Sequence, residues 1–394
     1  MPDSQMHVIQ FLQDPECVRS PADTMQVEYR LLCSGTLYRT VIGDWSKSEA
    51  SRFLLAPPLM LFAASRPIYD YPLELLLSFR VAQVNITTPG MGGTTLTTTF
   101  HPDAEVARDL ASLLTVLCRR LITVSGKTKE EHAHYPYNEF GHMPFPVTAM
   151  SRVYWPSLSA TVITSHTGQE IRNNNPPPLS VDPGVFTNML IGLPDASYAE
   201  SIVASARLYA LALELIREQP ELSYQLLISA VETIANEALS ALQPDDDEKV
   251  EFKRPVYKLA RELGMDDAIA RKMAIEACKG ENWATRKFKA FITDNLDESI
   301  WDKEDDLFKP LPNWALQRRD LQKTLGKIYS ARSKATHLGE PFPLSASYAG
   351  GPNLSVGVFA SLFGNEVAFP PIAWFERVVN SAIRGFWWKS VAAR

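Results

Sequence analysis

A polar, proline-rich segment at residues 172–178 constrains the fold more than any other feature of this sequence. It reads Arg-Asn-Asn-Asn-Pro-Pro-Pro, and three consecutive prolines favour an extended connector without internal hydrogen bonds. Charge density changes beside it, because residues 1–190 hold 14 basic and 17 acidic side chains whereas residues 191–394 hold 25 and 28. The sequence therefore predicts two domains, one at residues 1–178 and one at residues 179–394.

The first domain is predicted to have an α+β fold. Short runs rich in β-branched and aromatic residues alternate there with turn residues. The expected strands cover residues 25–33, 37–42, 79–88, 94–100 and 153–164. Two helices are expected, at residues 47–63 and 104–121, with Asp103 as the N-cap of the second.

The second domain is predicted to be an all-α bundle. Apolar residues at helical spacing predict helices at residues 198–218, 221–242, 255–263, 266–278, 284–292, 314–337 and 372–389. The helix at 221–242 is apolar nearly all round, which is typical of the central helix of a bundle. Pro244 and the acidic run at residues 245–248 are expected to end it.

Composition excludes several classes of protein. The formal net charge is −6, so no overall basic field attracts nucleic acid or anionic lipid, and any nucleic-acid contact has to be local. The longest apolar stretch, residues 53–64, is interrupted by two prolines and is shorter than the roughly twenty residues of a bilayer span. The four cysteines are scattered without CxxC spacing, which predicts reduced thiols and a cytoplasmic protein without a membrane span.

Three short patterns are similar to ligand sites and are set aside. Residues 125–128 (Ser-Gly-Lys-Thr) match the last residues of a phosphate-binding loop motif, but the upstream glycine of that motif is missing and the segment follows a predicted helix. His132, His134 and His142 cluster without a metalloenzyme spacing, so no metal or other cofactor is expected. Cys118 falls on an apolar helical stripe, which favours a position in the core.

The residues most suggestive of chemistry lie near the end of the helix expected at 314–337. Leu321, Leu325 and Ile328 form an apolar stripe, and Arg332 returns to within about 20° of it. A charge on a core-facing row is costly unless it is paired. We therefore expect Arg332 to have an acidic partner, and Glu232 on the central helix is the first candidate.

His337 follows Arg332 by five positions, which is about 140° around the helix and roughly 7.5 Å along its axis. Gly339 and Pro341 predict that the helix ends here, so His337 occupies its last turn. The two side chains of one chain therefore point in different directions. Two such helices related by a two-fold axis would bring both pairs to one cleft, which predicts a site shared by a dimer.

The same helix is locally basic. It carries Arg318, Arg319, Lys323, Lys327, Arg332 and Lys334 against one acidic residue, Asp320. One interpretation is a groove that binds a polyanion, and the other is a solvated helix face. Without Arg332 and His337 the solvated face would be favoured.

The segment from Tyr329 to Gly339, in which four residues separate Arg332 from His337, resembles the Arg-x4–6-His motif of HEPN domains. It is most similar to the ApeA-like branch, found in bacterial anti-phage and abortive-infection proteins. The apolar helix pair at residues 199–242, with Glu232 inside it, is similar to the first helices of a HEPN bundle. The resemblance covers residues 198–394 and implies that the second domain is a HEPN-type helical bundle.

This resemblance implies a metal-independent endoribonuclease that acts as a homodimer or higher homo-oligomer and cleaves RNA, with tRNA among the candidates. It gives His337 the role of general acid or base and Arg332 that of holding the scissile phosphate. Supporting residues would be Glu232, Ser333 and Lys334, and RNA contacts would come from Arg318, Arg319, Lys323 and Lys327. The first domain would be a sensor or regulatory unit that responds to an unidentified phage-derived trigger.

Two other interpretations stay open. In the first, the bundle is a non-catalytic dimerisation or nucleic-acid-binding module, and Arg332, paired with Glu232, is structural. It predicts that Arg332→Ala melts the fold while His337→Ala is silent. In the second, the first domain is itself an enzyme, although no complete catalytic motif occurs there.

Overall fold

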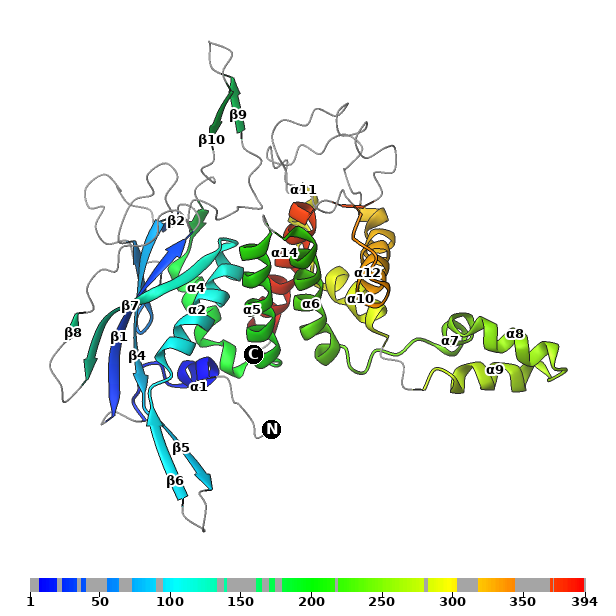
Figure 1. The fold of residues 1–394 in the computed structure, drawn as a ribbon, viewed down its shortest axis with the longest axis horizontal. Helices are drawn as coiled ribbons and strands as arrows, with labels where there is room; N and C mark the ends of the chain where they lie inside the picture. The colour runs from blue at the N-terminus through cyan, green and yellow to red at the C-terminus, as the bar shows by residue number, and fades with distance from the viewer. Residues whose placement is uncertain are drawn as a thin grey trace.

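The computed structural model of this chain joins an antiparallel sheet in its N-terminal part to a set of packed helices (Figure 1). This arrangement confirms the predicted order of an α+β part followed by a helical part. The structure describes residues 7–19, 23–33, 37–39, 55–63, 73–89, 95–132, 138–139, 161–164, 170–173, 179–216, 219–279, 283–302, 318–343, 369–370 and 372–392.

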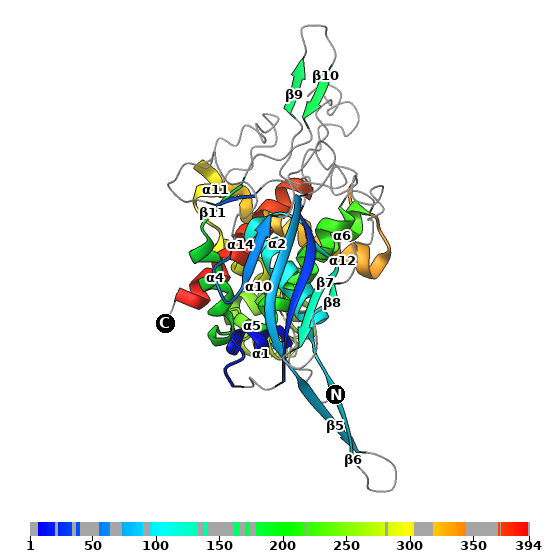
Figure 2. The ribbon, with the colours of Figure 1, turned by 90° about the vertical axis from the view of Figure 1, so that its left-hand side faces the viewer.

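Five strands form the main sheet, in the order β3-β4-β1-β7-β8 (Figure 2). Their bounds are β3 Met60–Ala63, β4 Leu73–Ala82, β1 Thr24–Cys33, β7 Ile122–His132 and β8 Asn138–Glu139. All their pairings are antiparallel. Since side chains alternate between the faces of a strand, residues such as Val27 and Leu31 of β1 share one face, where they join the core with residues of α2 (Asp103–Cys118).

Three smaller strand pairs accompany the sheet. They are the antiparallel pair β5 (Val84–Pro89) with β6 (Thr95–Phe100), the antiparallel pair β9 (Thr161–Thr164) with β10 (Glu170–Asn173), and the parallel pair β2 (Leu37–Arg39) with β11 (Leu179–Val181). The strand expected at residues 79–88 is therefore two strands, β4 and β5, which meet at Gln83. The connector expected at 172–178 begins within β10, and its residues 174–178 lie outside the described part of the chain.

Two predictions for the N-terminal part are wrong. Residues 60–63, expected to end a helix, form strand β3 and pair with β4, because apolar periodicity alone does not separate a short buried strand from a helix. Residues 47–54 of that expected helix lie outside the described residues. Asp103 is not the N-cap of α2 but its first residue; its carboxylate instead accepts a hydrogen bond from Tyr29 and pairs with Lys127.

The helices of the bundle surround α6, as its apolar composition predicts. Helices α5, α10 and α14 all contact α6. The main helices are α4 Pro183–Ile191, α5 Ala199–Leu215, α6 Pro220–Ala238, α10 Ala284–Asn295, α12 Leu321–Leu338 and α14 Ile372–Ala392. Shorter helical segments are α1 His7–Gln13, η2 Leu193–Asp195, α11 Ser299–Asp302 and η4 Arg318–Asp320. Among the helices that the structure describes, none has the length and apolarity that a membrane crossing requires.

The hydrophobic core continues from the sheet into the bundle. Buried residues of β1 and α2 belong to the same cluster as those of α5, α6 and α14. Helix α2 lies between the sheet and α5 (Figure 1). The bundle therefore packs directly on the helix that covers the sheet.

Three further helices form an arm that projects from the bundle on the side away from the sheet (Figure 1). They are α7 Asp246–Phe252, α8 Arg254–Glu262 and α9 Asp267–Glu276. The acidic run that was expected only to end α6 also starts α7, because Asp245 and Glu248 form a capping box at its N-terminus. We refer to residues 245–279 as the arm.

Candidate functional site at the end of helix α12

Helix α12 carries the Arg-x4-His segment and is anchored by its apolar stripe. Leu321, Leu325 and Ile328 are buried, and the helix packs against α10. Arg332 continues this stripe towards α6, as the helical spacing predicts. The hydrophobic stripe therefore determines which way the arginine points.

Arg332 pairs with Glu232, as predicted. The Arg332 Nη2 and Glu232 Oε2 atoms lie 3.1 Å apart, and the two side chains are 26% and 13% exposed. Tyr329 donates a second hydrogen bond to Glu232, with 2.5 Å between its Oη and Oε1, and the Arg332 guanidinium carbon lies 5.7 Å from the Tyr329 ring centroid. Both carboxylate oxygens of Glu232 are thus engaged by α12.

Tyr329 is part of this site, although its role was not predicted from the sequence. Partial burial and the hydrogen bond to Glu232 both raise the pKa of the Tyr329 phenol. The phenol therefore remains protonated and donates to the carboxylate at neutral pH. Its position three residues before Arg332 on the same helix was the available signal, because residues i and i+3 share a face.

His337 lies in the last turn of α12 and is exposed. The helix ends at Gly339, whose positive φ of 69° closes the last turn in the left-handed conformation. Within the described part of the chain, the imidazole makes no hydrogen bond or ion pair. His337 is therefore accessible to a ligand in solvent.

One chain does not bring Arg332 and His337 together. Lys323, Lys327, Lys334 and His337 fall within about 80° of arc around α12, whereas Arg332 falls on the opposite side of the helix. The exposure of these side chains agrees with their angular positions, since all three lysines and the histidine are exposed while Arg332 is half-buried. We call these four residues the basic face of α12.

Acidic side chains already pair with several of the predicted RNA-binding residues. Arg318 lies 2.7 Å from Glu298, Arg319 lies 3.7 Å from Asp320, and Lys334 lies 3.4 Å from Glu340. Lys323 and Lys327 have no acidic partner among the residues that the structure describes. Ser333 is half-buried at the margin between the basic face and the Glu232 side. The local charge of α12 is therefore smaller than its sequence suggests.

The patterns set aside in the sequence do not assemble a second site. Residues 125–128 lie within strand β7, where Lys127 Nζ contacts Asp103 at 2.6 Å and Glu130 at 2.8 Å. Burial raises the pKa of Cys118 to about 12, so its thiol stays protonated. His134 and His142 lie outside the described residues, and across the described ranges no cluster of His, Cys, Asp or Glu is arranged to hold a metal ion.

A hollow between α2 and α5 is a weaker candidate. Its volume is about 880 Å³, and its lining includes charged groups of both signs. Those groups are largely matched with one another: Arg207 makes two hydrogen bonds to Asp109, at 2.5 and 2.7 Å, and His7 lies 3.2 Å from Glu105. Arg108 and Glu214 also line the hollow and make no ion pair among the described residues, but they are of opposite sign. The hollow therefore shows no cluster of like charges that would select a ligand.

Comparison of this chain with family models, with curated proteins and with solved structures found no match. The chemistry of the site is therefore argued from its side chains.

Proposed function

We propose that this chain is a metal-independent endoribonuclease in which His337 transfers the proton. The observation that carries the proposal is the basic face of α12, where an exposed imidazole ends a row of three lysines. Lysines neutralise the phosphates of a nucleic-acid backbone, and imidazole is the side chain best suited to proton transfer near neutral pH. A phosphodiester along this face would lie next to an acid–base group.

The proposed reaction uses the RNA's own 2′-hydroxyl as the nucleophile. His337 accepts the proton of that hydroxyl, its oxygen attacks the adjacent phosphorus, and the bond from phosphorus to the 5′-oxygen breaks. The leaving 5′-oxygen takes a proton from solvent, His337 releases the proton that it accepted, and the other product carries a 2′,3′-cyclic phosphate. DNA lacks the 2′-hydroxyl and would not be cleaved.

Arg332 is proposed to stabilise the charge that develops on the phosphate. Within one chain it lies on the other side of α12 from His337, so this role requires a second copy of the chain. A guanidinium has five N–H donors, and the contact with Glu232 uses the Nη2 group. Glu232 and Tyr329 are therefore positioning residues that orient the guanidinium, and its remaining donors are available to a phosphate.

The biological role follows from the resemblance to ApeA-like HEPN proteins and is part of the proposal. The N-terminal α+β part would sense a phage-derived trigger, and RNA cleavage by the helical part would serve abortive infection. Control by a trigger is expected physically, because an uncontrolled ribonuclease would harm its host.

Cleavage of RNA by the purified protein in EDTA tests the activity. We expect wild type to release products with 2′,3′-cyclic phosphate ends and to leave DNA of the same sequence intact. His337→Ala should reduce the rate by about 10²–10⁴-fold, the usual contribution of a general acid or base. Thr336→Ala, which changes an exposed neighbour on the same turn, is the matched control. Equal cleavage by His337→Ala and wild type would end the assignment.

A non-catalytic module is the second candidate function, and the Glu232–Arg332 pair supports it. In that case the pair stabilises the bundle, and the basic face only binds nucleic acid. Wild type would then bind RNA without cleaving it, and His337→Ala would behave as wild type in growth and phage-challenge assays.

A further inference from the structure

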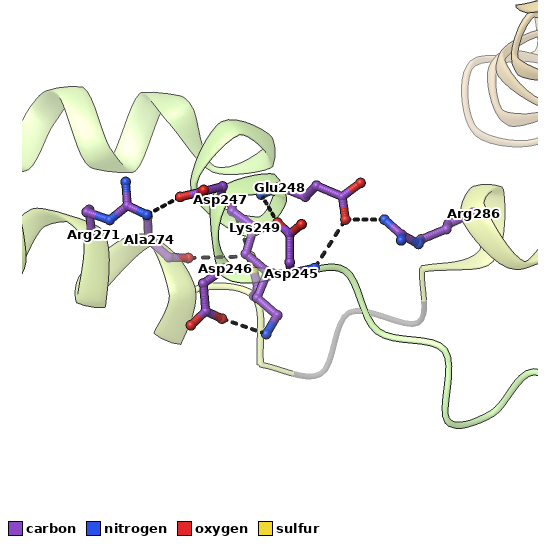
Figure 3. A network of polar contacts seen from close by, with 9 residues as sticks. Asp245, Asp246, Asp247, Glu248, Lys249, Arg271, Ala274 and Arg286 are labelled. Atoms are coloured by element: carbon purple, nitrogen blue, oxygen red, sulfur yellow. Dashed lines mark hydrogen bonds and ion pairs between the residues drawn. The ribbon is translucent and has the colours of Figure 1, made fainter.

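The arm has a very small core of its own. Its buried residues are Ala260 in α8, Ala270 and Ala274 in α9, and Cys278 just after α9. Alanine side chains bury little apolar area, so the packing of α8 on α9 is weak compared with that of the bundle. Polar contacts at its base compensate in part, since Arg271 pairs with Asp247, and Arg286 at the start of α10 pairs with Glu248 (Figure 3).

Four large apolar side chains of the α8–α9 hairpin are exposed. Leu259 is 57% exposed, Leu263 68%, Ile269 49% and Met273 41%. An amphipathic helix normally turns such residues towards a core. The arm turns alanines inwards and leaves these four side chains in solvent.

These four side chains share one side of the α8–α9 hairpin. Leu259 in α8 and Leu263 at its C-terminal cap lie about 100° and 60° before the inward-facing Ala260 around the helix axis. In α9, Ile269 and Met273 lie at the same angular offsets from Ala270. The two helices are antiparallel neighbours joined by a short turn. Because the two helices run antiparallel, side chains with the same angular offset from the direction of the partner helix project from the same side of the hairpin. We call Leu259, Leu263, Ile269 and Met273 the apolar face of the arm.

Each edge of the apolar face carries one lysine and one glutamate, four residues apart. Lys258 and Glu262 lie along the outer edge in α8, and Lys272 and Glu276 lie along the outer edge in α9. All four are exposed, and Glu276 also pairs with Lys279 at 2.6 Å. An edge with both signs of charge complements a copy of itself, whereas an edge with a single sign would repel its copy.

From these observations we propose that the apolar face of the arm binds the same face of a second copy of this chain. An isologous contact brings one surface patch against its copy across a two-fold axis, which suits an apolar centre with edges of mixed charge. Exposed apolar side chains that lie next to one another on the surface of a monomer often mark a binding site. An apolar centre with a charged rim is the usual anatomy of a protein–protein interface.

The location of the arm agrees with a role in assembly. It projects from the end of the bundle at which α10 and α12 lie, away from the sheet (Figure 1). A contact between two arms would therefore form on the side of the molecule that carries α12. A dimer formed through the arm rests on the proposed function in one respect: the shared site of Arg332 and His337 needs two copies of the chain.

The molar mass of the full chain in solution, measured by light scattering after size-exclusion chromatography, tests the proposal. We expect wild type to have twice its chain mass of 44.0 kDa and Leu259→Glu/Met273→Glu to have that mass once. Leu222→Glu is the matched control, because Leu222 is 40% exposed on α6 and receives the same charge, and it should remain a dimer. A monomeric wild type at tens of micromolar, or a double variant that stays dimeric, would overturn the proposal.

Charge variants test the same contact without altering the apolar face. Lys258→Glu/Lys272→Glu makes both edges acidic, and Glu262→Lys/Glu276→Lys makes both basic. Each variant alone should be monomeric through repulsion, and a mixture of the two should form a dimer. A mixture that stays monomeric would contradict a self-complementary contact, and circular dichroism of each variant checks that the helices persist.

These mass measurements use no RNA, so they can fail independently of the nuclease assay. If the arm variants are monomeric while His337→Ala cleaves like wild type, the nuclease proposal fails and the assembly proposal holds. If the arm variants stay dimeric while His337→Ala loses cleavage, the assembly proposal fails and the nuclease proposal holds.

Discussion

Arg119, in the left-handed conformation directly after α2, forms an ion pair with the fully buried Glu376 of α14, with 2.8 Å between Nη2 and Oε2. Tyr209 of α5 also donates a hydrogen bond to Glu376. One carboxylate therefore connects the helix that covers the sheet with two helices of the bundle. A domain boundary near residue 178, as predicted from the sequence, separates segments that share this contact.

Removal of the Glu376 carboxylate should destabilise the whole chain. Glu376→Ala leaves the Arg119 cation, 18% exposed, and the buried Tyr209 hydroxyl without their acceptor, and breaking such a buried pair costs about 3–5 kcal/mol. Urea unfolding followed by circular dichroism measures the loss. Glu298→Ala, which breaks an exposed pair with Arg318, should change the midpoint little. Similar midpoints for the two variants would contradict the role of Glu376.

Tyr329→Phe should lower stability by about 1 kcal/mol, because it removes one hydrogen bond to the largely buried Glu232. Arg332→Met should cost about 1–3 kcal/mol, since Glu232 then loses its cation. His337→Ala changes an exposed side chain and should shift the free energy of unfolding by less than about 0.5 kcal/mol. A destabilised His337→Ala would complicate its use in the cleavage assay, so thermal melts of all three variants should precede that assay.

Alkaline pH should destabilise the protein through its buried thiols and phenols. Burial raises the pKa of Cys118 from 9.0 to about 12, and it also raises the pKa of Cys33 and of Tyr209 and Tyr224. Because the folded state favours the protonated forms of these groups, their full contribution to the free energy of unfolding is present below the pKa of the thiol in the unfolded chain. It is lost as pH rises from about 9 towards 12.

The urea midpoint measured between about pH 7.5 and pH 10.5 tests this dependence. It should fall with pH in wild type and fall less steeply in Cys118→Ala, which lacks one of the titrating groups. A midpoint that rises over this range would contradict the direction of the shifts.

Gly385→Ala should destabilise the contact between α14 and α10. A Cβ at this position would overlap the backbone carbonyl oxygen of Asn295, so one of the two helices has to move, and overpacking of this kind typically costs about 1–3 kcal/mol. Gly326→Ala is the matched control, because a Cβ there has open space in α12. It should raise stability by about 0.5–1 kcal/mol through helix propensity. Thermal unfolding that ranks the two variants the other way would contradict the close approach of α10 and α14.

Helical periodicity made much of the bundle predictable. The apolar stripe of α12 indicated that Arg332 turns inwards, and the composition of α6 indicated that Glu232 would be near it. Both inferences depend only on residues within one helix, where the geometry repeats every 3.6 residues. The pairing of Arg332 with Glu232 is confirmed by the 3.1 Å contact.

Features that depend on contacts between distant segments were not predictable in this way. Strand β3 was expected to be helical, because a short apolar run fits a buried strand as well as a helix until its partner β4 is known. Asp103 had the position of a helix cap, but Tyr29 and Lys127, far from it in the sequence, determine its contacts. The exposed apolar face of the arm is another example, since Leu259 and Met273 have the spacing of core residues.

The sequence by itself determined where most helices lie, which side of each is apolar, and that a charged residue on an apolar row needs a partner. Only the tertiary structure decided which acid meets which base, which apolar residues stay in solvent, and that the sheet part and the bundle share one core. The reason is physical: periodicity within a helix is a local property, whereas burial and charge pairing depend on segments that the chain brings together only when it folds.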